Sequence, residues 1–417
     1  MSGTILFHSA LALVPSPLVP RPSPLTLKSR LPRTVIVLGF VSLFNDLASE
    51  MIVPLIPILL AGVLGAGPLA LGLIEGVADA VASFLRLWSG RHSDRLGARR
   101  KTLTVAGYAL SNIARPLLAF AGSWASVLLL RSVDRVGKGL RSAPRDALVA
   151  DATPAHIKGY AYGFHRALDN SGAVGGSLVA AAVLAWSGLP LAQVILLSAI
   201  PGFLAVLLIA FGIREPRAAP AAVPRTLAPL RWGALSPAMR RYLLVLALFT
   251  FARASETFIV LLGYQMGTGT VELLILWAAL NAAKALTSTA GGRLADSLGR
   301  GPLMLLSWTA FAACFLLFGK VNSSIGLWTV TIAYGLFFGL GEGAEKALIS
   351  DFAAPAEQGT AFGWYYLMLG LAAIPAGLLF GAVWQFQSAA MAFFLAAAIA
   401  AVAVLLLRGW AWPIRQK

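Results

Sequence analysis

Cysteine, histidine and charged residues are scarce in this sequence. The single cysteine, Cys314, excludes an internal disulfide bond, and the four histidines form no cluster that would hold a structural metal. Charged residues make up 12% of the 417 residues, whereas hydrophobic residues make up 58% and the mean hydropathy is +0.79. Soluble globular domains lie far from these values, so the sequence predicts an integral membrane protein.

Motifs of several enzyme classes and of ATP-driven pumps are also absent from the sequence. It contains no Gly-x4-Gly-Lys-Ser/Thr phosphate loop, no His-Glu-x-x-His zinc motif and no Gly-x-Ser-x-Gly nucleophile motif. We therefore expect no enzymatic activity, no cofactor and no resident metal, and we do not expect ATP to supply energy.

Apolar runs of about 20 residues, the length that crosses a hydrocarbon core, recur along the chain. Breaks at glycine, proline and charge clusters divide these runs into helices, which predicts an all-α membrane protein with twelve transmembrane helices. The expected helices span 35–62, 67–89, 103–121, 125–150, 159–186, 190–213, 239–265, 271–290, 302–319, 326–351, 360–384 and 388–408.

The net charge of +16 is concentrated in the connections on one side of the expected membrane. That side contains basic clusters such as 99–101, whereas the connections on the other side offer only Lys320. This distribution follows the positive-inside rule and predicts a protein of the cell inner membrane with both termini in the cytoplasm. It explains the positive charge without a nucleic-acid partner.

Residues 1–32 carry five prolines between positions 15 and 24, and no basic segment precedes the apolar run 5–14. We expect a disordered cytoplasmic tail, or a segment upstream of the native start, rather than a cleaved signal peptide. The other expected regions are a six-helix bundle at 33–213, a cytoplasmic linker at 214–236, a second bundle at 237–410 and a cytoplasmic tail at 411–417.

Internal repeats indicate that the chain uses one six-helix unit twice. The segment RDALVADATPAHIKGYAYGF (145–164) matches EKALISDFAAPAEQGTAFGW (345–364), and SGRHSDRLGARR (89–100) matches GGRLADSLGRGP (291–302). A third, shorter match joins ASE at 48–50 to ASE at 254–256. The expected architecture is therefore two pseudo-symmetric six-helix bundles.

The stretch GRHSDRLGARRK (90–101) resembles the signature loop between helices two and three of the major facilitator superfamily. The copy at 292–300 resembles the degenerate second occurrence of that loop, and RVGKGLRSA (135–143) is similar to the fourth-helix signature. SGAVGG (171–176) partly resembles a fifth-helix signature of exporters. The resemblance implies the major facilitator fold in a monomeric, drug/proton antiporter-like transporter.

The same resemblance implies a conformational gate in the signature loops. Asp94 is expected to hold the outward-facing state through contacts with a helix end and with arginines, and the glycines are expected to allow close helix approach. The gate candidates are Gly90, Asp94, Arg95, Gly97, Arg99 and Asp296.

Ionisable residues within the expected helices would each cost about 2.5–3.5 kcal/mol facing lipid, so we expect them to line a cavity or to pair. In the helix at 125–150, five basic residues from Arg131 to Arg145 share one face. The residues expected to face a solute cavity are Arg135, Lys138, Arg141, Arg145, Arg166, Asp169, Arg253, Glu256, Glu342, Glu345 and Lys346. The competing interpretation is that these charges only order the bundle.

Acidic residues four apart occur in the first two expected helices: Asp46 with Glu50, and Glu75 with Asp79. Partly desolvated carboxylates at this depth can exchange protons as access alternates, so all four are candidates for proton coupling. Permanent pairing with the basic helix face is the alternative.

These features predict a proton-coupled secondary active transporter in which two bundles rock around a midplane site to move a small solute. The resemblance favours an efflux antiporter. The basic helix face leaves open a symporter or exporter of an anionic metabolite or metal chelate. Two further alternatives are a divalent metal transporter that uses Asp46 and Glu50 and a non-transporting membrane receptor.

Overall fold

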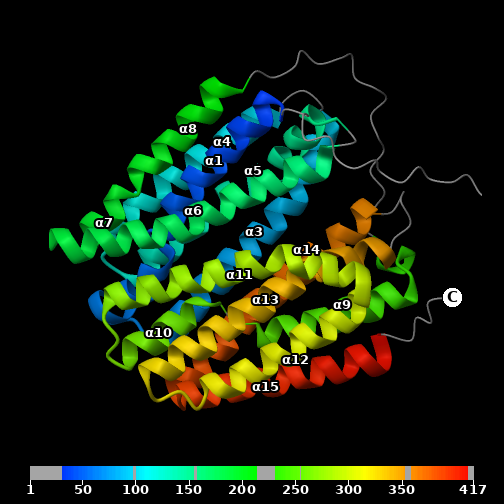
Figure 1. Cartoon of the computed structure of the whole chain (residues 1–417). Coiled ribbons are helices and arrows are strands. Elements are labelled where there is room, and N and C mark those ends of the chain that lie inside the picture. Colours follow the sequence, from blue (N-terminus) through cyan, green and yellow to red (C-terminus); the bar gives the residue numbers. More distant parts are fainter. Residues whose placement is uncertain are drawn as a thin grey trace, which may run out of the picture.

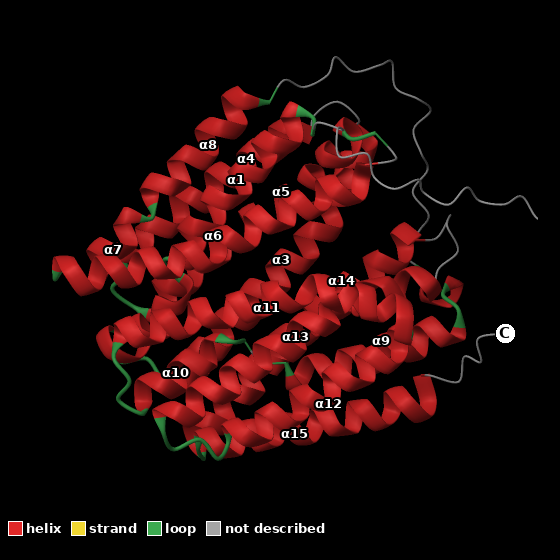
Figure 2. Ribbon diagram, in the orientation of Figure 1, coloured by secondary structure: helices red, strands yellow, loops and turns green. Residues whose placement is uncertain are grey.

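The computed structural model describes residues 31–96, 100–154, 157–213, 231–253, 255–352 and 358–411. Within these ranges the chain is helical and contains no strand (Figure 2). The expected tails at 1–32 and 411–417, and the expected linker at 214–236, lie almost entirely outside the described residues. The described end of the linker forms a 3-10 turn, Trp232–Ala234.

The first six crossings form the N-terminal half, residues 33–212 (Figure 1). They are α1 (Arg33–Glu50), extended by η1 (Val53–Leu55), α2 (Ile56–Ile58) and η2 (Leu59–Val63); α3 (Pro68–Leu96); α4 (Arg100–Leu117) with η3 (Leu118–Phe120); α5 (Trp124–Ala152); α6 (Lys158–Ser187); and α7 (Leu191–Leu197) with α8 (Ala199–Gly212).

The other crossings form the C-terminal half, residues 237–411. They are α9 (Pro237–Ala252) with α10 (Thr257–Gln265); α11 (Thr270–Leu298); α12 (Arg300–Phe318); α13 (Ser324–Phe352); α14 (Gln358–Phe386); and α15 (Ala389–Leu406) with η6 (Leu407–Ala411). The same packing recurs in both halves: α1 lies against α6 and α8 as α9 lies against α14 and α15. The expected fold of two pseudo-symmetric six-helix bundles is confirmed.

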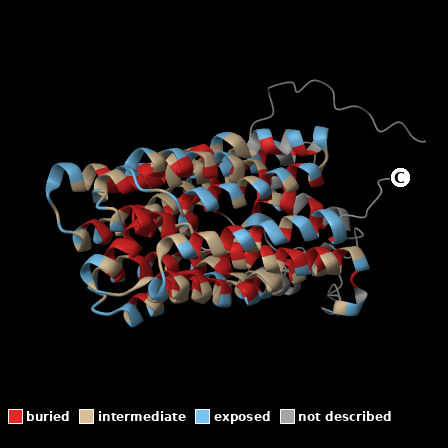
Figure 3. Ribbon diagram, turned by 90° about the horizontal axis from the view of Figure 1, so that it is seen from below, coloured by how far each residue is buried: buried red, intermediate tan, exposed pale blue. Residues whose placement is uncertain are grey.

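Ten of these crossings, among the described residues, are long and apolar enough to span a membrane. The remaining two, α4 and α5, carry more polar residues but turn them toward their neighbours, as the burial of Ser111 and Asp134 shows. Large apolar side chains are exposed at positions such as Trp186, Phe211 and Leu405. Figure 3 shows where exposed and buried residues alternate along the helices. Such a surface suits contact with lipid.

Two helices run further than the sequence predicted. α3 continues to Leu96 rather than ending near residue 89, and α11 continues to Leu298 rather than ending near residue 290. The signature residues from Gly90 to Leu96 therefore lie on a helix and not in a loop. A helix needs no apolar side chains once it has left the bilayer. The helix ends predicted from the ends of the apolar runs were therefore too early in the sequence.

The first crossing of each half is interrupted at the ASE repeat. α1 ends at Glu50 because the ring of Pro54 clashes with the Glu50 carbonyl and Pro54 has no N–H to offer it. The Ser177 hydroxyl of α6 donates to this carbonyl at 3.4 Å. In the second half, Ser255 and Glu256 lie in the break between α9 and α10. The two breaks place Glu50 and Glu256 at equivalent positions.

The halves touch along α3 and α14 and along α6 and α11. At the end formed by residues 62–68 and 264–269, the Leu69 amide donates to the Gln385 side chain across the halves at 3.2 Å, and Gly62 packs on Tyr264. In Figure 1 the two groups of helices are closest at this end, near α7 and α10, and diverge toward the C-terminus. The structure is therefore closed at one end.

Glycines allow α3 and α14 to cross in backbone contact. A Cβ at Gly72 would lie 2.0 Å from the carbonyl oxygen of Gly377, and a Cβ at Gly377 would lie 2.1 Å from that of Gly72. Real Cβ atoms do not approach an oxygen so closely. Each glycine is therefore required by the close approach of the two halves.

Replacing Gly72 with alanine should destabilise this arrangement by about 1–3 kcal/mol, because the two backbones must separate. Gly163→Ala in α6 is the matched control, since a Cβ there meets nothing within 4 Å. We expect the thermal unfolding midpoint of the purified protein to fall for Gly72→Ala and to hold or rise for Gly163→Ala. Equal midpoints would show that the crossing has room for a methyl group.

A charged cavity between the two halves as the candidate functional site

A cavity of about 450 Å³, the central cavity, lies between the halves. Its two walls differ in chemistry. The N-terminal half contributes mainly charged side chains: Glu50, Glu75, Asp79, Arg86, Arg131, Arg135 and Lys138. The C-terminal half contributes a largely aromatic wall, together with four charged side chains: Phe249, Trp277, Trp308, Phe311, Tyr334, Phe337, Phe338, Tyr365 and Tyr366, with Arg253, Glu256, Glu342 and Glu345.

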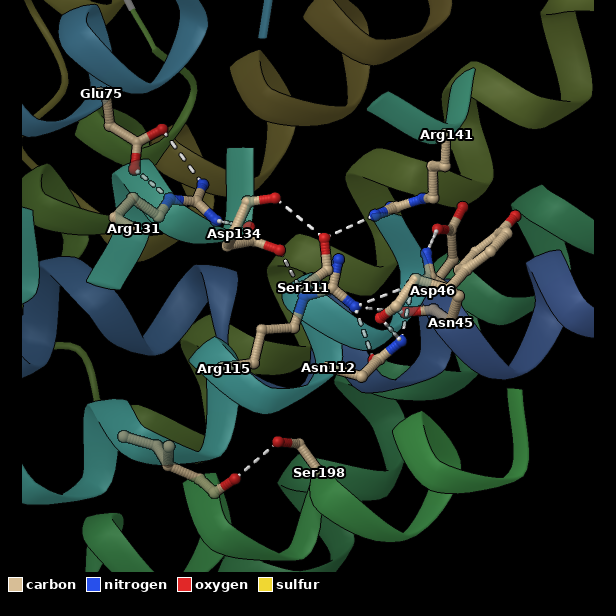
Figure 4. A network of polar contacts seen from close by, with 12 residues as sticks. Asn45, Asp46, Glu75, Ser111, Asn112, Arg115, Arg131, Asp134, Arg141 and Ser198 are labelled. Atoms are coloured by element: carbon tan, nitrogen blue, oxygen red, sulfur yellow. Dashed lines mark hydrogen bonds and ion pairs between the residues drawn. The ribbon is translucent and has the colours of Figure 1, made fainter. Parts of the chain in front are cut away.

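A buried ion network joins two residues of the charged wall, Glu75 and Arg131, to Arg115 and Asp134 behind it (Figure 4). Arg131 donates to both carboxylate oxygens of Glu75, at 3.1 and 3.2 Å, and lies 3.4 Å from Asp134. Arg115 reaches the other oxygen of Asp134 at 2.9 Å. All four residues are at most 4% exposed. The network joins α3, α4 and α5 into one rigid wall.

Uncharged polar residues complete this network. Arg115 also donates to the Asn45 carbonyl and side chain and to the Asn112 side chain, at 3.0–3.1 Å. Ser111 donates to the Asp134 carbonyl at 2.8 Å and accepts from Arg141 at 2.6 Å. Asn45, Ser111 and Asn112 were not among the residues that the sequence predicted for the site. Their only sequence signal is polarity within apolar runs.

The basic face of α5 divides between the cavity and the helix packing. Arg131, Arg135 and Lys138 line the central cavity. Arg141 instead donates to Ser111 and lies over the Tyr108 ring, 4.7 Å from its centroid, and Arg145 pairs with Asp146 at 2.9 Å and donates to Ser42 at 3.3 Å. Neither Arg141 nor Arg145 lines this cavity, because α4 and α1 cover that edge of the helix.

Three polar contacts join the halves, and each involves one acidic residue of the central cavity wall: Glu50, Glu75 or Glu342. Arg166 and Asp169, which the sequence placed in the cavity, do not line it. The indole of Trp277 in α11 donates to the Glu50 carboxylate at 2.7 Å. The Ser255 hydroxyl donates to Glu75 at 3.4 Å. Arg166 of α6 pairs with Glu342 of α13 at 2.5 Å and lies 4.0 Å from Asp169. The hydrogen bonds of Glu50 and Glu75 therefore depend on the relative position of the two halves.

The C-terminal half pairs its own charges. Arg253 lies 3.2 Å from Glu345, which also accepts from the Tyr365 hydroxyl at 2.6 Å. Glu256 pairs with Lys284 and accepts from the Tyr334 hydroxyl at 2.9 Å. The sequence marked Arg253, Glu256 and Glu345, whereas the two tyrosine hydroxyl contacts depend on the tertiary packing.

The remaining residues that the sequence proposed for the site either lie outside the central cavity or are not fully described by the structure. Asp46 accepts from Asn45 at 2.9 Å and is not among the residues that line the central cavity. Among the gate candidates, Gly90 lies in α3. A Cβ added at Gly90 would lie 3.4 Å from the Cβ of Ala143 in α5. Of Asp94, Arg95, Asp296 and Lys346 only the helical backbone is described, and Gly97 and Arg99 lie outside the described residues.

Comparison with known proteins agrees with this architecture. Residues 38–283 and 258–416 match the Major Facilitator Superfamily. An uncharacterized MFS-type transporter of Methanocaldococcus jannaschii is 30% identical over 385 residues, covering 90% of this chain and 94% of that protein. Multidrug resistance protein MdtH of Yersinia pestis is 31% identical over 191 residues, 44% of each chain.

Among solved structures, the nucleoside transporter NupG has a TM-score of 0.72 and covers 90% of this chain and 99% of its own. At 14% sequence identity this likeness shows a common fold. The matched residues, the duplicated bundles and the cavity between them agree. The chain therefore belongs to the major facilitator superfamily and is a multi-pass membrane transporter rather than an enzyme.

Proposed function

We propose that this protein is a proton-coupled antiporter of the cell inner membrane that exports a small organic solute by alternating access. The observation that carries the proposal is the hydrogen bond between Glu50 and Trp277. It joins a titratable group in the cavity wall of one half to the other half. Gain or loss of a proton at Glu50 then changes the free energy of the contact between the halves.

The strength of this bond depends on the charge of Glu50. A hydrogen bond to an ionised carboxylate is roughly twice as strong as one between neutral groups. Ionised Glu50 therefore favours the conformation in which Trp277 is within reach, and protonated Glu50 favours it less. Asp79 is exposed to the same cavity and forms no ion pair with a described residue, so it is a second titratable group open to solute.

The basic connections support an orientation for this state. They follow the ends of helices such as α3 and α11, opposite the closed end at residues 62–68 and 264–269. The positive-inside rule then puts the closed end outside the cell and both termini in the cytoplasm. In this orientation the structure represents an inward-facing state of a monomeric transporter, with Arg166 and Glu342 bridging the halves on the cytoplasmic side of Glu50.

Export is supported by the partial similarity to a multidrug resistance protein and by Gly175 and Gly176 in α6, at the position of the exporter signature. Gly176 packs against the Leu47 carbonyl, which a Cβ would approach to 2.4 Å. This close approach brings α6 onto α1 beside Asp46 and Glu50. The exporter-like glycine thus supports the helix that carries the proposed coupling residue.

Proton coupling can be tested in proteoliposomes that contain the pH-sensitive dye pyranine and an imposed pH gradient. Two permanently charged probes, 2-naphthalenesulfonate and trimethyl(2-naphthyl)ammonium, cover both signs of solute charge. We expect one of them to dissipate the gradient faster than in protein-free vesicles, and the gradient to drive its accumulation. Transport of a probe at a rate and to a level independent of the pH gradient would overturn proton coupling.

A further inference from the structure

Three basic residues of the central cavity remain without a carboxylate partner. Arg86 of α3 and Arg135 and Lys138 of α5, the cation cluster, form no ion pair within the described part of the chain. The other cavity arginines, Arg131 and Arg253, are each paired with a glutamate. Ion pairs therefore account for the other two basic residues of the cavity wall but not for these three.

The cation cluster is also incompletely hydrogen-bonded. Arg135 is 9% exposed, and its Nε has no hydrogen-bond partner among the described residues. The Nε of Arg86 is also buried without a hydrogen-bond partner among the described residues. Its guanidinium lies over the Tyr366 ring, 4.9 Å from the ring centroid. A buried guanidinium N–H without an acceptor costs free energy that an incoming oxyanion would recover.

The three cations repel one another at the same place. Arg135 and Arg86 are the basic groups that act most strongly on Lys138, with Asp46 and Arg141 as its other charged neighbours. Of the acidic neighbours of Arg135, Asp134 and Glu75 already pair with Arg115 and Arg131, and Asp79 lies beyond ion-pair distance. All three cations also line a smaller chamber of about 190 Å³ that opens beside the central cavity.

We propose that the cation cluster of Arg86, Arg135 and Lys138 binds the oxyanion group of an organic anion whose apolar body packs against the aromatic wall of the other half. This assignment rests on the proposed transport through the central cavity and adds the chemical class of the solute. The N-terminal half supplies charge and the C-terminal half supplies Trp308, Phe311 and Phe338, so one ligand with both features contacts both halves at once.

Binding to the purified full-length protein tests the proposal, with three naphthalene probes that differ only in charge. These are 2-naphthalenesulfonate, 2-naphthylmethanol and trimethyl(2-naphthyl)ammonium. We expect the sulfonate to bind at least about tenfold more tightly than the other two, because charged hydrogen bonds to arginine are the strong ones. Inorganic sulfate, which lacks the apolar body, should bind more weakly than the sulfonate.

Variants of the cluster separate this site from non-specific attraction. Arg135→Gln and Lys138→Gln should each weaken sulfonate binding about tenfold, and Asp79→Asn, which removes a negative charge beside Arg135, should strengthen it. Lys320→Gln, at an exposed position outside the cavity, is the matched control and should bind as the wild type does. Lys138 is partly exposed and forms no ion pair with a described residue, so its variant decides the test even where Arg135→Gln fails to fold.

Equal affinity for the three probes, or unchanged sulfonate affinity in Lys138→Gln, would overturn the assignment. Proton coupling and the anion site are tested by different outcomes. Proton-driven flux of the ammonium probe without sulfonate binding would remove only the anion site. Sulfonate binding without any effect of a pH gradient on flux would remove only proton coupling.

Discussion

Replacing Asp134 with asparagine should reduce the stability of the protein by about 3–5 kcal/mol, the largest loss that we expect from any single substitution described. Asp134 is 1% exposed and its two oxygens serve Arg115 and Arg131. Without this carboxylate, one glutamate is left to neutralise two buried guanidinium groups. Total stabilities of domains are only about 5–15 kcal/mol, so much of the protein should fail to accumulate in the membrane.

The measurement is unfolding of the purified protein in mixed micelles with increasing denaturing detergent. Asp146→Asn is the matched control, because Asp146 also pairs with an arginine but its side chain is 54% exposed, and exposed pairs are worth about 0–1 kcal/mol. The double variant Asp134→Asn/Arg115→Gln should lose less than the sum of the single variants, since it removes both partners of one pair. Equal losses of stability in Asp134→Asn and Asp146→Asn would show that the buried ion network contributes no more to stability than an exposed ion pair.

Glu50→Gln should abolish gradient-driven accumulation while solute exchange without a gradient continues. One proton exchanged per solute across one pH unit corresponds to 1.36 kcal/mol and about tenfold accumulation. Glutamine can still accept a hydrogen bond from Trp277 but cannot bind and release a proton, so the accumulation ratio should fall to about one. Asp46→Asn, which removes the other acidic side chain of α1, should have a similar effect, and the assay on proteoliposomes measures both.

Two variants sharpen this test. Trp277→Phe keeps the titratable group but removes the bond between the halves, so it should retain coupling and shift the balance between the two access states. Glu272→Gln is the matched control: Glu272 also accepts from an indole, that of Trp328, at 2.9 Å, but within one half and outside the cavity. Wild-type accumulation in Glu50→Gln, or an equal loss in Glu272→Gln, would exclude Glu50 from coupling.

The helices and their duplication could be predicted from the sequence because both depend on local patterns. Apolar runs set the crossings, and the ASE repeat supported the duplication. The sequence predicted single helices at 35–62 and 239–265, however, and so missed the breaks after Glu50 and at Ser255 and Glu256. The extensions of α3 and α11 were missed because hydropathy reports the bilayer boundary and not the helix boundary. The duplicated bundles followed from the order of the matched segments.

The candidate site could be predicted only in part because helix periodicity gives a direction but not a neighbour. The basic residues of α5 share a face, yet α3, the cavity and α4 meet that face at different points, so Arg131 meets Glu75 while Arg141 meets Ser111. The bond from Trp277 to Glu50 joins residues 227 positions apart, and no pattern in either segment indicates it.

The glycine crossing of α3 and α14 has a consequence for the speed of the rocking motion that we propose. Where Gly72 meets Gly377, the contact consists of main chain on both sides. Two helices that meet without side chains can roll over each other with no rotamer to rearrange and no interlocked ridges to lift apart. In the proposed rocking motion, the Gly72–Gly377 contact would therefore add little to the activation barrier.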